Sequence, residues 1–185
     1  THIARDLHDE IGSTLTSINI LSNISGRHIE SDHNKARLMI NKINEQSLHI
    51  QQSMSDIVWA INPENDKLEN MVVRMREFVA YTLEPKNVNI DFKVDDAVAK
   101  ESLNIQERRD LLLIFKESIN NIAKYAACKN VRITMVRQNG NIELMVVDDG
   151  IGFDTSRITS SNGLKNIRAR AAALNGQVKI DSKPG

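Results

Sequence analysis

Cysteine, proline and aromatic residues are scarce in this chain of 185 residues, which holds one Cys, three Pro, one Trp, two Tyr and four Phe. The lone Cys128 excludes an intrachain disulfide framework and a cysteine-based zinc site, and it is typical of a reducing compartment. Long apolar runs are also lacking, since none approaches the roughly 20 residues that span a bilayer.

An excess of charge of either sign is missing too. The chain carries 24 basic and 24 acidic residues, for a formal net charge of zero. A nucleic-acid surface normally shows as a basic excess, so this balance argues against nucleic acid as a partner. Any anion that the protein binds must therefore be held by a local site. With 41% apolar and 26% charged residues, the composition is that of a globular protein.

The scarce residues are unevenly distributed along the chain. No aromatic residue or proline precedes Trp59 and Pro63, whereas five of the eight glycines lie between Gly140 and Gly176. A front without proline and rich in Leu and Ile predicts long helices, and a glycine-punctuated rear predicts mixed sheet and helix.

The front contains two series of apolar or small residues at alternating steps of three and four, on either side of the polar break Ser25-Gly26-Arg27. They are Ala4, Leu7, Ile11, Thr14, Ile18 and Leu21, and then Ala36, Ile40, Ile43, Ser47, Ile50, Met54, Ile57 and Ile61. This spacing predicts an antiparallel helical hairpin. Two helices alone would leave much of each stripe exposed, so we expect a homodimer that forms a four-helix bundle. The alternative is a hairpin that packs on the rear domain.

The rear shows capping pairs, alternating apolar positions and turn residues. They predict a helix from the Asp66/Glu69 pair to Leu83, a strand over 88–94, a helix from the Asn104/Glu107 pair to Ala126, a hairpin of 131–136 and 142–147 turning at Asn139-Gly140, a helix over 164–174 closed by Asn175-Gly176, and a strand over 177–181. The predicted fold class is α+β.

The strand that ends at Val147 is followed by Asp148-Asp149-Gly150-Ile151-Gly152. Glycines at this spacing after a strand suggest close approach of a ligand to the backbone, although a simple turn would look the same. A dinucleotide-binding fold would start a helix at once. The Ser- and Thr-rich segment 155–162 predicts a loop instead, so that fold is excluded.

A second polar group lies on the helix before the hairpin. Glu117, Asn121 and Lys124 are four and three residues apart and share one face of a regular helix. A carboxylate, an amide oxygen and an ammonium suit a hydrated Mg²⁺ with its phosphates, because magnesium takes few protein oxygens. The alternative is a solvated helix face. Gly163 opens a later helix, whose free N–H groups can receive a phosphate.

The order Glu-x-x-x-Asn, Asp-x-Gly-x-Gly and Gly-Leu-Lys-Asn-Ile resembles the ATP-binding domain of sensor histidine kinases, a Bergerat-type α/β sandwich shared with gyrase-like ATPases. The resemblance implies that Asp148 accepts a hydrogen bond from the adenine amino group, that Asn121 with Glu117 holds Mg²⁺, and that 153–162 form an ATP lid. It assigns nucleotide binding to Asn121, Lys124, Asp148, Gly150, Gly152, Gly163 and Leu164. The family often has His where Tyr125 stands, so Tyr125 is left out of the site.

Of the five histidines, His8 has the most distinctive surroundings. It follows the seam residue Leu7, so it points about 100° away from the seam. Gly12 lies one turn further on and leaves that side of the imidazole uncovered. A neutral imidazole is a good nucleophile near neutral pH. Without the ATP-binding motifs, an ordinary exposed histidine would explain these features equally well.

The segment from Ile3 to Gly12 closely resembles the histidine box of the sensor kinases whose phosphoacceptor is followed by Asp. The resemblance implies that His8 takes the γ-phosphoryl of ATP, that Asp9 acts as a base or orients the imidazole, and that Glu117 assists catalysis. The phosphoryl then passes to an aspartate of a response regulator. Many members carry Gln where Ser13 stands, which puts phosphatase activity in doubt.

The resemblance covers nearly the whole chain and divides it into a phosphotransfer hairpin, 1–62, a connecting helix, 63–86, and an ATP-binding domain, 87–185. We interpret the chain as the cytoplasmic fragment of an inner-membrane-anchored sensor, truncated at its C-terminus. Two rival functions are a Bergerat-type ATPase or anti-sigma-like serine kinase, and a catalytically inactive dimeric scaffold.

Overall fold

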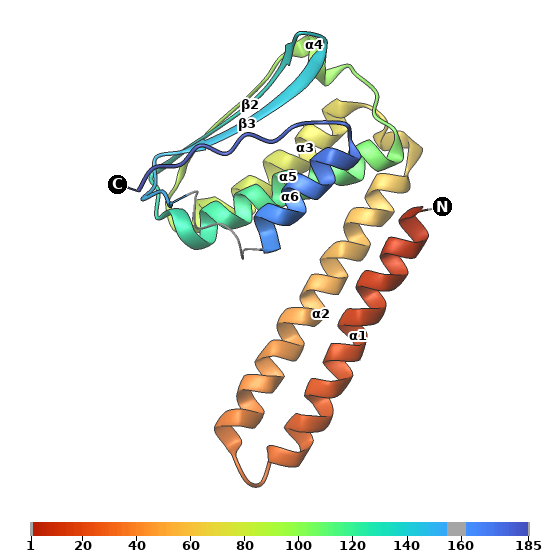
Figure 1. Ribbon diagram of the computed structural model, residues 1–185, viewed down its shortest axis with the longest axis vertical. Coiled ribbons are helices and arrows are strands. Elements are labelled where there is room, and N and C mark those ends of the chain that lie inside the picture. Colours follow the sequence, from red (N-terminus) through yellow and green to blue (C-terminus); the bar gives the residue numbers. More distant parts are fainter. Residues whose placement is uncertain (1, 155–161, 185) are drawn as a thin grey trace. The chain divides into compact units, whose positions relative to one another are not determined.

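The computed structural model describes residues 2–154 and 162–184, with the side chains of 11–154 and 163–184. The chain divides into two compact units, Thr1–Trp59 and Ala60–Gly185 (Figure 1). In the described parts of the chain, no helix is long and apolar enough to cross a bilayer.

The first unit is an antiparallel pair of long helices, α1 (His2–His28) and α2 (His33–Ile61), joined by a short turn (Figure 1). Gln46 Nε2 donates to Ser17 Oγ at 3.0 Å, and Ser25 Oγ donates to the Ala36 carbonyl at 3.3 Å. The predicted hairpin is confirmed. The break expected at 25–27 lies instead at 29–32, because the buried Ser25 bonds across to α2 and the helix continues past it.

The seam of the hairpin differs from the predicted one on α2. On α1, the predicted positions from Ile11 to Leu21 are partly buried. On α2, the partly or fully buried positions are Ala36, Met39, Ile43, Gln46, Ile50, Ser53, Asp56, Ile57, Trp59 and Ala60. Ser47 and three apolar residues of the predicted α2 stripe are exposed within a single chain, namely Ile40, Met54 and Ile61 at 44%, 50% and 49%. This exposure agrees with the expectation that two helices alone leave much of the stripe uncovered. Two paired helices bury only a narrow a/d stripe, and these three residues lie beside it.

A three-stranded sheet forms one layer of the second unit. Its strands are β1 (Asn89–Val94), β2 (Asn130–Gln138) and β3 (Asn141–Asp148), in the order β1-β2-β3. The pair β1 and β2 is parallel, whereas β2 and β3 are antiparallel. The turn of the predicted hairpin is confirmed, with Asn139 and Gly140 at φ values of 51° and 84°. Two positive φ angles in a two-residue loop are typical of a type I′ turn.

Helices α3 (Leu68–Leu83), α5 (Ile105–Asn121) and α6 (Asn162–Ala173) form the second layer, against one face of the sheet (Figure 1). A short helix, α4 (Asp96–Ala99), follows β1. Phe115 of α5 is fully buried, with its ring centroid 6.5 Å from Phe78 and 6.0 Å from Phe92. The predicted α/β sandwich is confirmed. Helix α3 packs in this unit, although it lies within the range 63–86 that the sequence analysis assigns to a connector. The predicted domain limits stay a prediction.

Helix capping follows the prediction at α5 and departs from it at α3. The Asn104/Glu107 capping box forms, with both hydrogen bonds present. The Asp66/Glu69 box does not, because Lys67 precedes the first residue of α3 and the Asp66 carboxylate pairs with Arg108. A 3₁₀ turn, η1 (Pro63–Asn65), comes before it and is capped by Asn62.

Two further predictions require correction. The helix that ends at Ala126 finishes as a π turn, η3 (Ile122–Ala126). The strand expected over 177–181 is absent, since residues 177–184 have no regular secondary structure and join none of the three strands. The end of this segment bonds to the loop after β3 rather than to a neighbouring strand: Ser182 Oγ accepts the Phe153 N–H at 2.9 Å.

Candidate functional site

The start of α6 lies against two of the predicted site residues on α5. A Cβ atom added to Gly163 would lie 2.1 Å from Glu117 Oε1 and 3.5 Å from Asn121 Nδ2. A side chain at 163 would force the Glu117 carboxylate to move, whereas glycine lets the first turn of α6 lie this close to the two side chains. Gly163 is therefore a neighbour of Glu117 and Asn121, which were predicted from a different motif.

This arrangement places a polar pair beside a helix N-terminus. The first N–H groups of a helix lack intrahelical partners and favour negative charge. Helix α6 has no acidic residue in its own first turn. Leu164, the other predicted residue of this turn, is partly buried. The first turn of α6 with Glu117 and Asn121 thus offers both N–H donors and oxygen acceptors.

The loop after β3 is held against the π turn. Asp148 Oδ1 accepts the Gly150 N–H at 2.9 Å, and the Ile151 N–H donates to the Ala126 carbonyl at 2.9 Å. A Cβ atom on Gly150 would lie 2.3 Å from the Ala126 carbonyl oxygen. Glycine is therefore required at 150 for the packing of this loop on η3, which fixes the position of Asp148.

Gly152 has a packing role that the sequence did not suggest. Its φ of 60° is left-handed, and an added Cβ would lie 2.0 Å from the Lys183 carbonyl oxygen. Glycine is required on both grounds. The segment around Ser182 and Lys183 thus supports the loop that carries Gly152.

Lys124 lies in η3 and is exposed. The α-helical spacing that puts Lys124 on the face of Glu117 and Asn121 does not continue through a π turn, which has more residues per turn. The contact of Lys124 with phosphates stays a prediction. Tyr125, beside it, is also exposed.

Asp149 was missed by the sequence reasoning and joins two strand ends. Its Oδ1 accepts the Lys129 and Asn130 N–H groups at 2.8 and 2.9 Å, and its Oδ2 accepts the Asn130 side-chain amide at 2.7 Å. The side-chain bond from Asn130, followed by these backbone bonds, lowers the pKa of the Asp149 carboxyl to about 2. The doubled aspartate at the end of β3 was the available signal.

The Asp149→Asn variant is expected to be less stable than the parent at pH 5, with a difference that disappears in acid. Because folding lowers the pKa from 3.8 to about 2, the carboxylate contributes its full stability above about pH 4 and loses it as the pH falls towards 2. Thermal midpoints of both proteins between pH 5 and pH 2 test this. Asp181→Asn, on an exposed ion pair with Lys179, is the control and should show a small difference throughout. A difference in thermal midpoint between Asp149→Asn and the parent that stays constant from pH 5 to pH 2 would contradict the prediction.

Part of the predicted site lies outside the described residues. His8 and Asp9 belong to helix α1, but their side chains are not among those described, and neither are residues 155–161 of the predicted lid. The roles of these residues stay predictions.

The described residues fit a magnesium ion with few protein ligands. No cluster of three or more His, Cys, Asp or Glu side chains occurs among them. Mg²⁺ does not need one, since it keeps several waters and binds one or two protein oxygens together with substrate phosphates. Glu117 and Asn121, both beside Gly163, offer one carboxylate and one amide oxygen.

Family comparisons cover both units. The profile of a family described as "Histidine kinase" matches residues 1–66. A second, described as "Histidine kinase-, DNA gyrase B-, and HSP90-like ATPase", matches residues 106–185. The chain belongs to the sensor histidine kinases. The order of the two matches agrees with a helical hairpin followed by an ATPase domain.

Relatives of this histidine kinase align over almost its whole length. The Salmonella typhimurium histidine-protein kinase/phosphatase UhpB is 26% identical over 99% of this chain and 36% of its own length. The Bacillus subtilis sensor histidine kinases ComP and DesK are 25% and 22% identical over 99% of this chain, and over 24% and 48% of their own lengths. The chain thus spans about a quarter to a half of these relatives.

A solved histidine kinase has the same fold. The Acinetobacter baumannii histidine kinase AdeS superposes with a TM-score of 0.61 over 91% of this chain and 90% of its own, at 16% identity. This kinase therefore shares the hairpin and α/β architecture with a protein of quite different sequence.

Proposed function

We propose that this protein autophosphorylates His8 with ATP and then passes the phosphoryl group to an aspartate of a response regulator. The approach of Gly163 to Glu117 and Asn121, which belong to a different sequence motif, is the observation that carries the proposal. It creates a place for phosphates in the domain that matches the histidine kinase-type ATPases.

The residues of the second unit bind and orient the nucleotide. Asp148, fixed by its bond to the Gly150 N–H, accepts a hydrogen bond from the adenine amino group. The first-turn N–H groups of α6, from Gly163 and Leu164, face the phosphates, and Lys124 adds a positive charge. Glu117 and Asn121 supply the oxygens for Mg²⁺, which neutralises phosphate charge when it is bound.

The reaction itself requires one nucleophile. A ring nitrogen of His8 attacks the γ-phosphorus, so that an N–P bond forms while the bond from that phosphorus to the β,γ-bridging oxygen breaks and ADP leaves. The ring proton passes to Asp9 or to solvent. Positioning and charge neutralisation supply most of the rate acceleration, as in other phosphoryl transfers.

The second transfer and the cellular setting belong to the same proposal. The phosphoryl group moves from His8 to a carboxylate of a response-regulator receiver domain. A sensor region in the same protein is supported by the names of the relatives, which call ComP and DesK sensors. Attachment of that region to the inner membrane, with this part in the cytoplasm, completes the proposal.

Self-association of the hairpin is also part of the proposal. The helices of the first unit expose several large apolar side chains outside the a/d seam: Leu15, Ile20, Leu38, Ile40, Leu48, Met54 and Val58. Of these, Ile40, Met54 and Val58 share one face of α2, and a second copy would cover that face and complete a four-helix bundle.

The purified chain is expected to have about twice its chain mass of 20.8 kDa in light scattering. The double change Ile40→Lys/Met54→Lys should shift it to the monomer, because two charges would enter the apolar face. Asn41→Lys/His49→Lys adds the same charge at exposed polar positions on the other side of α2 and should stay dimeric. A monomeric parent, or a dimeric Ile40→Lys/Met54→Lys variant, would contradict the expected interface.

Incubation with γ-labelled ATP and Mg²⁺ tests the function as a whole. A phosphohistidine is labile in acid and stable in base, so we expect label that acid removes. Acid-stable label would indicate a serine kinase, and release of free phosphate without labelled protein an ATPase. Failure to bind Mg·ATP would indicate an inactive scaffold.

A further inference from the structure

Arg108 is a buried arginine that the proposed chemistry does not use. It lies on the second turn of α5 and is 2% exposed. A buried guanidinium must be paired and hydrogen-bonded to be tolerated. Its position is also unusual, because a cation close to a helix N-terminus opposes the helix dipole. Its partners must therefore lie outside α5.

The main partner of Arg108 is the end of α2. Both Nε and Nη2 donate to the Ala60 carbonyl, at 3.0 and 2.6 Å. Ala60 is in the last turn of α2, where carbonyl groups lack intrahelical donors. Helix α2 has no basic residue in its own last turn. Arg108, 48 residues further along the chain, therefore supplies the positive C-terminal cap that α2 lacks.

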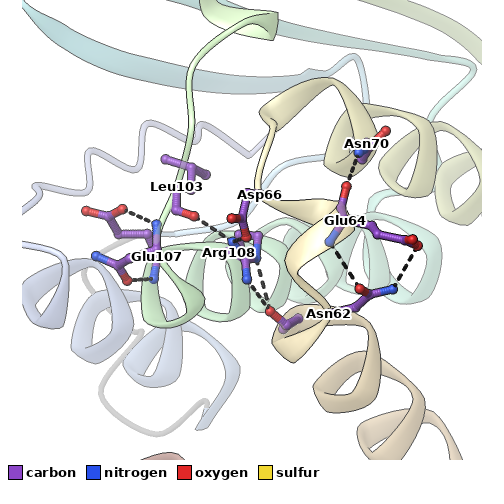
Figure 2. Close-up of polar contacts among 9 residues, drawn as sticks. Asn62, Glu64, Asp66, Asn70, Leu103, Glu107 and Arg108 are labelled. Atoms are coloured by element: carbon purple, nitrogen blue, oxygen red, sulfur yellow. Dashed lines mark hydrogen bonds and ion pairs between the residues drawn. The ribbon is translucent and has the colours of Figure 1, made fainter.

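The remaining donors of Arg108 join two more segments to this point. Nη1 donates to the Leu103 carbonyl at 2.6 Å and pairs with the Asp66 carboxylate (Figure 2). These two partners are themselves connected, because the Leu103 N–H donates to the Asp66 carbonyl at 2.9 Å. The guanidinium thus binds the end of α2, the segment that follows it, and the loop that leads into α5.

The connector itself is also held by hydrogen bonds. Asn62 accepts the Glu64 N–H at 3.0 Å, and the Asn70 side-chain amide of α3 donates to the Glu64 carbonyl at 2.7 Å (Figure 2). This path from Ala60 to α3, called the joint below, is therefore held by hydrogen bonds within the second unit. Arg108 bonds to it at Ala60 and Asp66, and to the adjoining loop at Leu103.

We propose that Arg108 is a positioning residue, which fastens the last turn of α2 to the ATPase domain and so controls how that domain delivers ATP to His8. The inference rests on the proposed function for its effect on phosphorylation. Arg108 is nine residues from Glu117 on α5, about 14 Å along the helix at 1.5 Å per residue. It acts on delivery of the phosphoryl group without contact with the nucleotide.

Kinetics of Arg108→Met test the effect on the reaction. Autophosphorylation at saturating ATP should fall by about tenfold or more, because small errors of position are costly in phosphoryl transfer. The affinity for Mg·ATP should stay within about twofold, because the two sites are far apart. Arg108→Lys, which keeps the positive charge but loses the planar set of guanidinium N–H donors, should recover part of the rate. Arg132→Met removes an exposed arginine that pairs with Asp91 and should have no effect.

A distance measurement tests the joint independently of activity. Spin labels on Gln51→Cys of α2 and Tyr81→Cys of α3, both exposed, in a Cys128→Ser background, would report the distance across the joint by pulsed electron resonance. Labelled chains are diluted with unlabelled ones so that distances within one chain dominate. Arg108→Met should broaden the distance distribution, and Arg132→Met should not.

Several results would overturn the proposal. An unchanged distance distribution would show that Arg108 does not hold the joint. A broadened distribution with normal phosphorylation would remove its role in delivery, and an equal loss of ATP affinity would move its effect to the nucleotide site. If Arg108→Met does not fold, Asp66→Asn, which removes only the anionic partner, serves in its place. It should also lower the phosphorylation rate and broaden the distance distribution. Should the parent show no phosphorylation, the proposed function fails and the distance distribution alone decides whether Arg108 holds the joint.

Discussion

Replacement of His8 by glutamine is expected to reduce acid-labile labelling from γ-labelled ATP to the background of the assay. Glutamine fits a helix and keeps a polar side chain, but its amide nitrogen is not a nucleophile, so no N–P bond can form. Binding of Mg·ATP should be unchanged, because the proposed nucleotide site lies in the second unit. Filter-bound label before and after acid treatment, beside a nucleotide-binding isotherm, makes the measurement.

The matched control for this variant is His49→Gln. His49 is an exposed histidine of α2, and its replacement should leave labelling intact. Undiminished labelling of His8→Gln would remove His8 as the phosphoacceptor. Loss of labelling in both variants would point to a general effect of histidine replacement on the hairpin instead.

Asn121→Asp is expected to have the second largest effect, a loss of about 100-fold or more in phosphorylation, comparable with removal of a key polar group from an active site. The change keeps the shape of the side chain and adds a negative charge beside Glu117 and Gly163. Two adjacent carboxylates would repel the phosphates at the first turn of α6. Calorimetric titration with Mg·ATP should show the loss as weaker binding.

Asn120→Asp provides the control on the same helix. Asn120 is the neighbour of Asn121 and points about 100° away from it, so the added charge is the same but misses the site. Phosphorylation should stay within about twofold of the parent, as for most changes outside a site. Equal losses for Asn120→Asp and Asn121→Asp would show that charge on α5, rather than the Asn121 position, matters.

The hairpin, the sheet and the helical layer could be predicted because their signals are local and repeated. Alternation along β1 and β2, the Asn139-Gly140 turn and the Asn104/Glu107 capping box each determine structure within a few residues. The α2 seam was harder, since Ile40 and Met54 are as apolar as the residues that the hairpin buries. Only the geometry of two paired helices decides which apolar positions face the partner helix.

The parts of the site that the sequence did not reveal depend on contacts between distant segments. Asp66 was assigned to a helix cap, but the buried charge of Arg108 competes for its carboxylate. Asp149 was passed over because its partners, at 129–130, come 19 and 20 residues earlier in the chain, at the start of β2. For Lys124, the α-helical spacing did not foresee the π turn at 122–126. The motifs identified the chemistry, whereas these residues hold the motifs in place.

The position of the unit boundary has an optical consequence. The protein has a single tryptophan, Trp59, and it precedes Ala60, whose carbonyl Arg108 holds. All of the intrinsic indole emission therefore originates one residue from the joint. Changes in its wavelength or anisotropy when Mg·ATP is added would report on that point in the unmodified protein, without any attached dye.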